Sequence, residues 1–124
     1  IRHIIDHSEK LLEKRGEIIF SEGQHAESFY ILIDGSVCLY WGSRHRETKI
    51  NTLGSGGAVG FINMLCMHSF WGDVEFDKDS VVLCISNALF ASLPIVDGEQ
   101  FSILLMNLAR DMGRTYLDKI LPKV

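Results

Sequence analysis

The spacing of apolar residues changes twice along this chain and divides it into three parts. In residues 1–13 the apolar positions recur at helical spacing, which predicts a short amphipathic helix. Residues 18–85 instead carry short apolar runs separated by polar turns, a pattern typical of β-strands. After Asp97 apolar residues recur every three or four positions, which predicts a long C-terminal helix.

The middle part contains a series of short strands joined by turns. We expect strands at residues 18–20, 29–33, 37–41, 49–53, 73–76 and 81–85. Asp34-Gly35 is a hairpin signal between two of these runs. Residues 54–57 contain three glycines and favour an irregular segment, because glycine weakens helices and strands alike. Residues 61–67 are apolar and fit either a helical turn or a buried strand.

Two helices are predicted after the strands. Ser86 and Asn87 can cap a short helix that ends at Pro94, because proline interrupts helical hydrogen bonding. Asp97, with Gln100 three residues later, has the capping-box pattern that opens the last helix. Residues 98–121 would span about 36 Å, more than a small barrel needs to cover itself. This helix carries an apolar stripe at coiled-coil-like spacing: Phe101, Leu105, Leu108 and Met112.

Length and composition limit the chain to one small globular unit. Its 124 residues are 47% hydrophobic and 23% charged, which suits a single hydrophobic core. No apolar run approaches the about 20 residues needed to span a bilayer, and no secretory signal is visible. Three cysteines without paired spacing are typical of buried thiols in a reducing compartment, so we expect a cytoplasmic location. The net charge of -4 argues against this segment gripping a phosphate backbone by itself.

One run of residues carries a much more specific signal than composition does. It consists of Gly16-Glu17, Ile19-Phe20, Glu22-Gly23, Phe29-Tyr30-Ile31-Leu32 and Gly35-Ser36-Val37. This run resembles the first half of a cyclic-nucleotide-binding domain, with its turn glycines and barrel-filling strands. Leu53-Gly54, Gly56 and Val59-Gly60 resemble the glycines that precede the ligand cassette of that family. The resemblance extends from about Gly16 to Phe90.

The resemblance implies a mainly β fold with helices at both ends. The expected core is a double-stranded β-helix, a jelly-roll or cupin-like β-roll, with an N-terminal helix and a long C-terminal helix. We divide the chain accordingly into a helical arm over residues 1–15, a cyclic-nucleotide-binding-like β-roll over residues 16–93, and a dimerisation-type helix over residues 94–124.

Among the family's settings, the long last helix favours a Crp–Fnr-type transcriptional regulator. In such regulators the β-roll is followed by a dimerisation helix and then a helix-turn-helix domain. We therefore expect an effector-sensing domain that forms a homodimer through the stripe at Phe101, Leu105, Leu108 and Met112. DNA binding would then belong to a segment beyond Val124. The alternative is a ligand-free adaptor or regulatory module for another protein, whose last helix packs back on its own barrel.

The ligand cassette departs from the family pattern at the residues that matter for the phosphate. In members that bind cyclic nucleotides, a Glu follows the glycine equivalent to Gly60 and holds the ribose, and an Arg about ten residues later pairs with the phosphate. Here Phe61 follows Gly60, and no Arg or Lys lies between Val59 and Phe76. A phosphate buried without a cation loses its charge-assisted hydrogen bonds. We expect no cyclic nucleotide binding in the usual mode.

The cassette that remains is apolar and aromatic. We take its ligand-pocket candidates to be Gly60, Phe61, Met64, Leu65, Phe70 and Trp71. Either these side chains fill the former ligand cavity, or they line a site for a small apolar effector. We expect no cofactor and no metal.

The residues support three other kinds of site less well: an iron–sulfur cluster, a haem site and a cupin-type metal site. An iron–sulfur cluster needs about four cysteine ligands, and this chain has three scattered ones. A haem-based sensor could use His68 or Cys66 as an axial ligand, although a lone histidine beside an apolar run is more often structural. A cupin-type metalloenzyme requires a His-x-His pair, and the chain has none. We therefore expect a protein that is not an enzyme.

Overall fold

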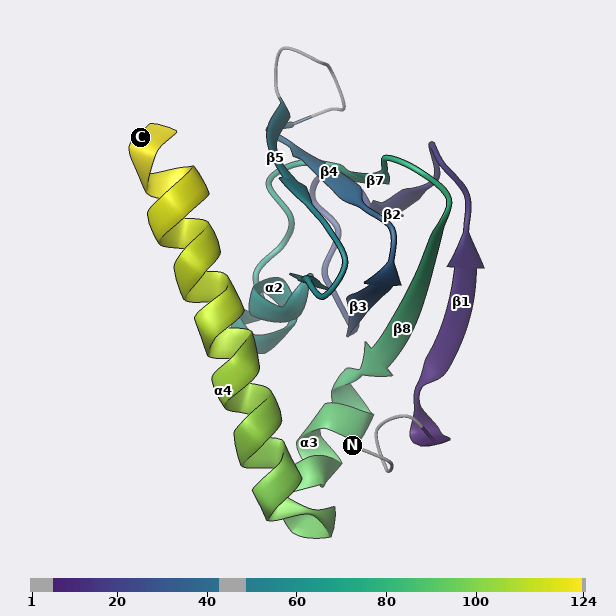
Figure 1. The fold of residues 1–124 in the computed structure, drawn as a ribbon, viewed down its shortest axis with the longest axis vertical. Helices are drawn as coiled ribbons and strands as arrows, with labels where there is room; N and C mark the ends of the chain where they lie inside the picture. The colour runs from purple at the N-terminus through teal and green to yellow at the C-terminus, as the bar shows by residue number, and fades with distance from the viewer. Residues whose placement is uncertain (1–5, 43–48, 124) are drawn as a thin grey trace.

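The strands form two antiparallel sheets of four strands each in the computed structural model, which describes residues 6–42 and 49–123 (Figure 1). The first sheet has the order β1 (Glu9–Glu13), β8 (Ser80–Ser86), β3 (Ser28–Asp34) and β6 (Ala58–Val59). The second has the order β2 (Ile18–Phe20), β7 (Val74–Phe76), β4 (Val37–Tyr40) and β5 (Lys49–Leu53). The predicted mainly β architecture, of jelly-roll type, is confirmed.

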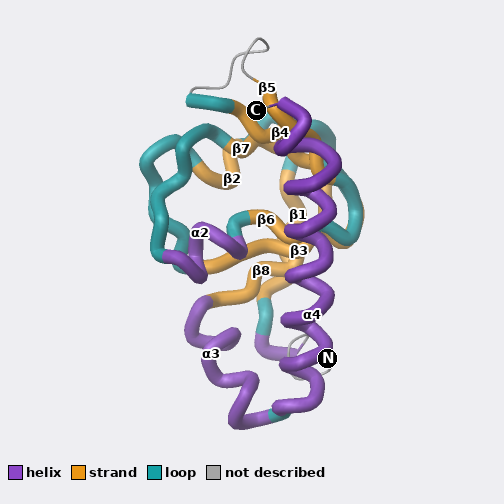
Figure 2. The backbone as a smooth tube through the Cα atoms, turned by 90° about the vertical axis from the view of Figure 1, so that its left-hand side faces the viewer, coloured by secondary structure: helices purple, strands orange, loops and turns teal. Residues whose placement is uncertain are grey.

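The helices lie beside the first sheet. Helix α2 (Phe61–Cys66) follows β6, and α3 (Asn87–Val96) leads into the long α4 (Gly98–Thr115). A π-helical turn, η2 (Tyr116–Ile120), and a 3-10 turn, η3 (Leu121–Lys123), extend α4 to the end of the described chain. Figure 2 shows α4 running alongside the strands with α3 packed against its beginning. None of the described helices combines the length and hydropathy needed to cross a bilayer.

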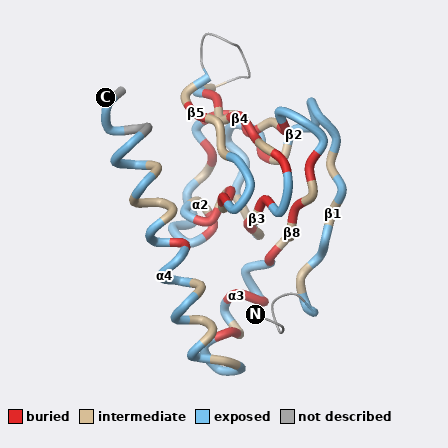
Figure 3. Tube along the Cα trace, viewed as in Figure 1, coloured by how far each residue is buried: buried red, intermediate tan, exposed pale blue. Residues whose placement is uncertain are grey.

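Two apolar clusters hold the layers together. The first lies between the sheets, and its residues come from both: Phe20, Leu32, Val37, Val59, Phe70, Val74, Phe76 and Val82. The second, the helix-side cluster, lies between the first sheet and the helices: Phe29, Phe61, Met64, Ile85, Leu89, Phe90, Leu93 and Leu108. Figure 3 shows the buried positions concentrated along the strands and on the inner side of the helices. Strands β3 and β8 supply residues to both clusters because alternate side chains point to opposite faces.

The predicted N-terminal helix is wrong for residues 9–13, which form strand β1. This strand pairs with β8 in antiparallel register from Glu9↔Cys84 to Glu13↔Ser80. The short segment Glu-Lys-Leu-Leu-Glu fits a helical turn by spacing, but pairing with the edge of β8 satisfies its backbone instead. Residues 6 and 7 are helical, and residues 1–5 lie outside the described part of the chain.

Two further details of the helices differ from expectation or settle an open choice. Helix α3 continues past Pro94 to Val96, and the amide of Asp97 donates to the carbonyl of Leu93 at 2.8 Å. The proline removes only its own donor, so the last turn survives. The predicted caps are confirmed, since Ser86 accepts from the amide of Leu89 and Asp97 from that of Gln100. The ambiguous residues 61–67 form helix α2 and its left-handed C-cap.

Candidate functional site

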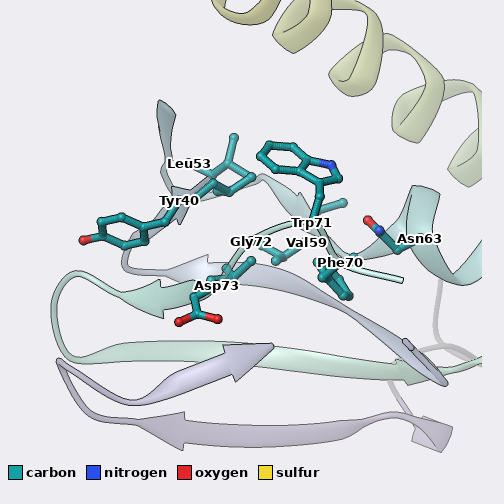
Figure 4. Close-up of a pocket in the computed structure, with 12 residues that line it drawn as sticks. Tyr40, Leu53, Val59, Asn63, Phe70, Trp71, Gly72 and Asp73 are labelled. Atoms are coloured by element: carbon teal, nitrogen blue, oxygen red, sulfur yellow. The ribbon is translucent and has the colours of Figure 1, made fainter. Parts of the chain in front are cut away.

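A small pocket lies where the cassette meets the second sheet (Figure 4). Its volume is about 90 Å³. Its lining residues come from β4, β5, β6, the start of α2, the segment before β7 and β7 itself: Leu39, Tyr40, Leu53, Ala58, Val59, Gly60, Asn63, Phe70, Trp71, Gly72, Asp73 and Val74. Ligand pockets for drug-sized molecules typically measure about 300–1,000 Å³. The cavity is therefore too small for a nucleotide in this conformation.

Aromatic side chains occupy the space next to this pocket. Phe70 is 7% exposed and stacks on Phe20 with ring centroids 4.2 Å apart. The backbone at Gly60 has a φ of 84°, and a Cβ there would lie 2.7 Å from the Phe20 ring. Backbone hydrogen bonds fix Phe70, whose amide donates to Gln24 and whose carbonyl accepts from Gly23. The interior of the β-roll is thus packed up to the backbone of the cassette.

Two tryptophan rings pack together next to the pocket, and one of them lines it. Trp71 lines the pocket and is 39% exposed, while Trp41, just after β4, is 64% exposed. Their ring centroids are 4.8 Å apart with the planes tilted by 43°. In Figure 4 the Trp71 ring points from its loop toward helix α4. Trp71 thus gives the pocket an aromatic wall, and Trp41 packs against that ring.

Asn63 holds the cassette loop in place from helix α2. Its amide nitrogen donates to the carbonyls of His68 and Ser69, each at 3.2 Å. The side chain also borders the pocket (Figure 4). Sequence reasoning missed Asn63, although a single amide among apolar cassette residues could have marked it.

The family model for the cyclic nucleotide-binding domain matches residues 13–94. The chain belongs to this family. A cyclic nucleotide-binding domain from Methylobacillus flagellatus has a similar structure, with a TM-score of 0.83 and 16% identity over 99% of this chain and 71% of that one. In a comparison with curated proteins, none matched the chain.

Two solved structures of regulators share the fold of this cyclic nucleotide-binding domain. The catabolite activator protein of Thermus thermophilus has a TM-score of 0.72 and 19% identity, covering 93% of this chain and 53% of its own. The N-terminal domain of a transcriptional regulator from Streptomyces coelicolor has a TM-score of 0.68 and 19% identity, covering 87% of this chain and 76% of its own. At these identities the similarity shows a shared fold.

Only half of the predicted pocket residues line the pocket of this cyclic nucleotide-binding domain. Gly60, Phe70 and Trp71 do so. Phe61 and Met64 are buried instead in the helix-side cluster, because they lie three residues apart on the inner face of α2. Leu65, on the same helix, is 52% exposed.

Among the residues that the structure describes, the pocket lining offers no positive charge to a phosphate. These described lining residues include one carboxylate, Asp73, and neither an arginine nor a lysine. Asp73 accepts a hydrogen bond from the amide of Glu22 at 2.8 Å. In Figure 4 its carboxylate and the Trp71 ring point in opposite directions. The lining side chains that face Trp71 are therefore uncharged.

The cassette contains one histidine, which makes a local contact, and one exposed cysteine. The Nδ1 atom of His68 lies 2.7 Å from the carbonyl oxygen of Ser69, and Cys66 is exposed on α2. Cys84 lies on β8, in the first sheet. Within the described residues, His, Cys, Asp and Glu side chains do not gather in groups of three or more that could hold a metal ion.

The predicted dimer stripe is directed largely inward. Leu108 is 5% exposed within the helix-side cluster, and Phe101 and Met112 pack against the same cluster. Of the four predicted interface residues, Leu105 alone is exposed, at 38%. A second apolar stripe, which shares Leu105 with the predicted one, lies on the outer face of α4 and its continuation: Leu105, Met106, Ala109, Gly113, Tyr116 and Leu117.

Proposed function

We propose that this domain is an effector-sensing module of a Crp–Fnr-type regulator that does not bind cyclic nucleotides in the usual mode. The observation that carries the proposal is the filled cassette. The cavity measures about 90 Å³, its described lining residues include no cationic side chain, and Phe70 stacks on Phe20 beside it. A cyclic nucleotide would need both space and a counter-charge, and neither is available there.

The cavity suits at most a very small, uncharged ligand. Water occupies about 30 Å³ in the liquid, so the space holds a few heavy atoms unless Phe70 or Trp71 moves. Its lining of Leu39, Leu53 and Val59 favours an apolar group. The competing candidate is a ligand-free adaptor, which the tight packing of Phe70 on Phe20 favours. Neither role requires catalysis, and we propose none.

Isothermal titration calorimetry of the purified domain tests this proposal. We expect no saturable heat with cyclic AMP or cyclic GMP at low millimolar concentration, because no charge-assisted bond replaces phosphate hydration. Indole, which is larger than the closed cavity and can enter only if Phe70 or Trp71 moves, serves as the uncharged aromatic probe in a parallel titration, with Trp71→Ala as the control variant.

The outcomes separate the candidates. Micromolar affinity for either cyclic nucleotide would overturn the main proposal. Indole binding that is lost in Trp71→Ala would support the sensor, and the absence of any indole heat would support the adaptor.

A homodimer through the outer stripe of α4 is part of the same proposal. The stripe exposes 56% of Met106, 52% of Tyr116 and 61% of Leu117. Ala109 and Gly113 lie between these side chains, and small residues let two helices approach closely. Such an interface leaves the inner face of α4 packed on its own β-roll.

A further inference from the structure

A second cavity, of about 430 Å³, lies on the outer face of the second sheet. The alternation of side chains along the strands separates this outer cavity from the small pocket beside the cassette. Leu39 and Val74 point inward to that pocket, whereas Cys38 and Glu75 point to the opposite face, and Tyr40 borders both cavities. The volume falls within the range of about 300–1,000 Å³ typical of small-molecule sites. A metabolite therefore fits the outer cavity by size, whereas it does not fit the small pocket beside the cassette.

The floor of the outer cavity is buried and polar. Cys38 is 2% exposed and Tyr40 is 9% exposed. The Tyr40 hydroxyl lies 3.5 Å from Oε1 of Glu75, and the Cys38 sulfur lies 3.7 Å from the Thr52 hydroxyl. Burial raises the pKa of the Cys38 thiol and of the Tyr40 phenol, so both groups stay uncharged at neutral pH. The floor thus offers neutral hydrogen-bonding groups.

The rim carries charges of both signs. Arg15 and Lys49 line the cavity with cationic groups, and Glu75 and Asp77 line it with carboxylates. The backbone holds one side of the rim, because the amide of Arg15 donates to Asp79 at 3.0 Å. The amide of Gly16 donates to the carbonyl of Phe76 at 2.9 Å. These bonds fix the Arg15 turn relative to β7.

We propose that this outer cavity binds a small zwitterion of the α-amino acid type. Its carboxylate would pair with Arg15 and Lys49, and its ammonium group with Asp77 and Glu75. A simple anion would meet the two carboxylates and a simple cation the two basic groups, so a ligand with both charges fits best. The inference goes beyond the proposed function by giving the domain an effector site outside the cassette.

The position of this cavity also connects it to the C-terminal helix. Lys49 begins strand β5, and β5 contacts the turn η2 that continues α4. A ligand held by Lys49 therefore touches an element in direct contact with the end of the helix. This contact gives the outer cavity a physical route to the proposed dimer interface.

Thermal shift and calorimetry with defined probes test the site. The probes are L-serine, L-threonine and L-glutamine at about 10 mM, a concentration suited to weak metabolite binding. The tightest is then compared with its α-amide, which lacks the carboxylate, and its N-acetyl derivative, which lacks the ammonium group. Arg15→Gln and Asp77→Asn remove one rim charge each, and Lys14→Gln is the matched control on the neighbouring exposed residue.

We expect saturable binding of at least one free amino acid, with both derivatives weaker by about tenfold or more, as loss of a charge-assisted bond predicts. Arg15→Gln and Asp77→Asn should weaken binding by a similar factor, and Lys14→Gln should leave it unchanged. No shift with any of the three amino acids would overturn the proposal. Equal binding of the derivatives, or unchanged binding by Arg15→Gln, would overturn it as well. Cyclic nucleotide titrations are independent of these results.

Discussion

At the residue scale, the cassette shows how a binding site is filled from within. Gly60 keeps the left-handed conformation that begins the cassette, with a φ of 84°. The next residue, Phe61, turns away into the helix-side cluster, and Phe70 enters the space between the sheets. Both aromatic side chains thereby bury apolar surface, which stabilises the fold.

Gly60→Ala should lower the free energy of unfolding by roughly 2–4 kcal/mol, since it combines an unfavourable positive φ with overpacking of a core. The new Cβ would lie 2.7 Å from the Phe20 ring. Gly54→Ala is the matched control, because no atom lies within 4 Å of a Cβ at that position. Urea denaturation of the three proteins measures the difference. Equal midpoints for Gly60→Ala and the natural sequence would contradict the packing described for Phe20.

At the element scale, α4 has two apolar faces with different environments. Its inner face, which includes Leu108, covers the first sheet and α3. Its outer face exposes Met106 and Leu117. A helix that is apolar on both faces packs against its own domain on one side and is open to a partner on the other.

Charges placed on the outer face should separate a dimer without unfolding the domain. We expect Met106→Glu combined with Leu117→Glu to sediment as a monomer at high micromolar concentration, because each buried carboxylate in the interface would lack a partner. Asn107→Glu, on an exposed polar position of the same helix, should stay dimeric. Sedimentation velocity distinguishes these states. A natural sequence that already sediments as a monomer would contradict the dimer.

The same two-faced helix explains where sequence reasoning succeeds and where it stops. The spacing of apolar residues was enough to predict the later strands and the last helix, because alternating and helical patterns follow directly from backbone geometry. It could not assign the inner and outer faces of α4, since both are apolar and only tertiary packing distinguishes them. Strand β1 was missed because Leu11 and Leu12 fit either structure until β8 is present. In the cassette, Phe61 and Met64 went inward because α2 is a helix, a choice the apolar run left open.

At the scale of the whole molecule, one sheet is shared by both apolar clusters. Strand β3 contributes Leu32 to the cluster between the sheets and Phe29 to the helix-side cluster. Strand β8 contributes Val82 and Ile85 in the same way. If either cluster is lost, one face of strands β3 and β8 becomes exposed. The other cluster is built on the opposite face of the same strands.

Unfolding should consequently be a single cooperative transition. Tryptophan fluorescence reports on the second sheet through Trp41 and Trp71, and far-ultraviolet circular dichroism reports mainly on α4. The unfolding midpoints measured by the two signals should coincide. Leu32→Ala and Leu108→Ala remove equal volumes from the two clusters, and each should cost roughly 2–5 kcal/mol and shift both signals together. A helix signal that is lost first in Leu108→Ala would show that the clusters are independent.

The pairing of β1 with β8 sets an order in which the chain can be completed during synthesis. Strand β1 can pair only after residues 80–84 have been synthesised. Glu9–Glu13 therefore remain unpaired until almost the whole β-roll has been made. Contacts between segments so distant in sequence slow folding, because the intervening loop must be closed first. A nascent chain halted before β8 carries β1 and β3 with unpaired edges, the kind of surface that chaperones cover on the ribosome.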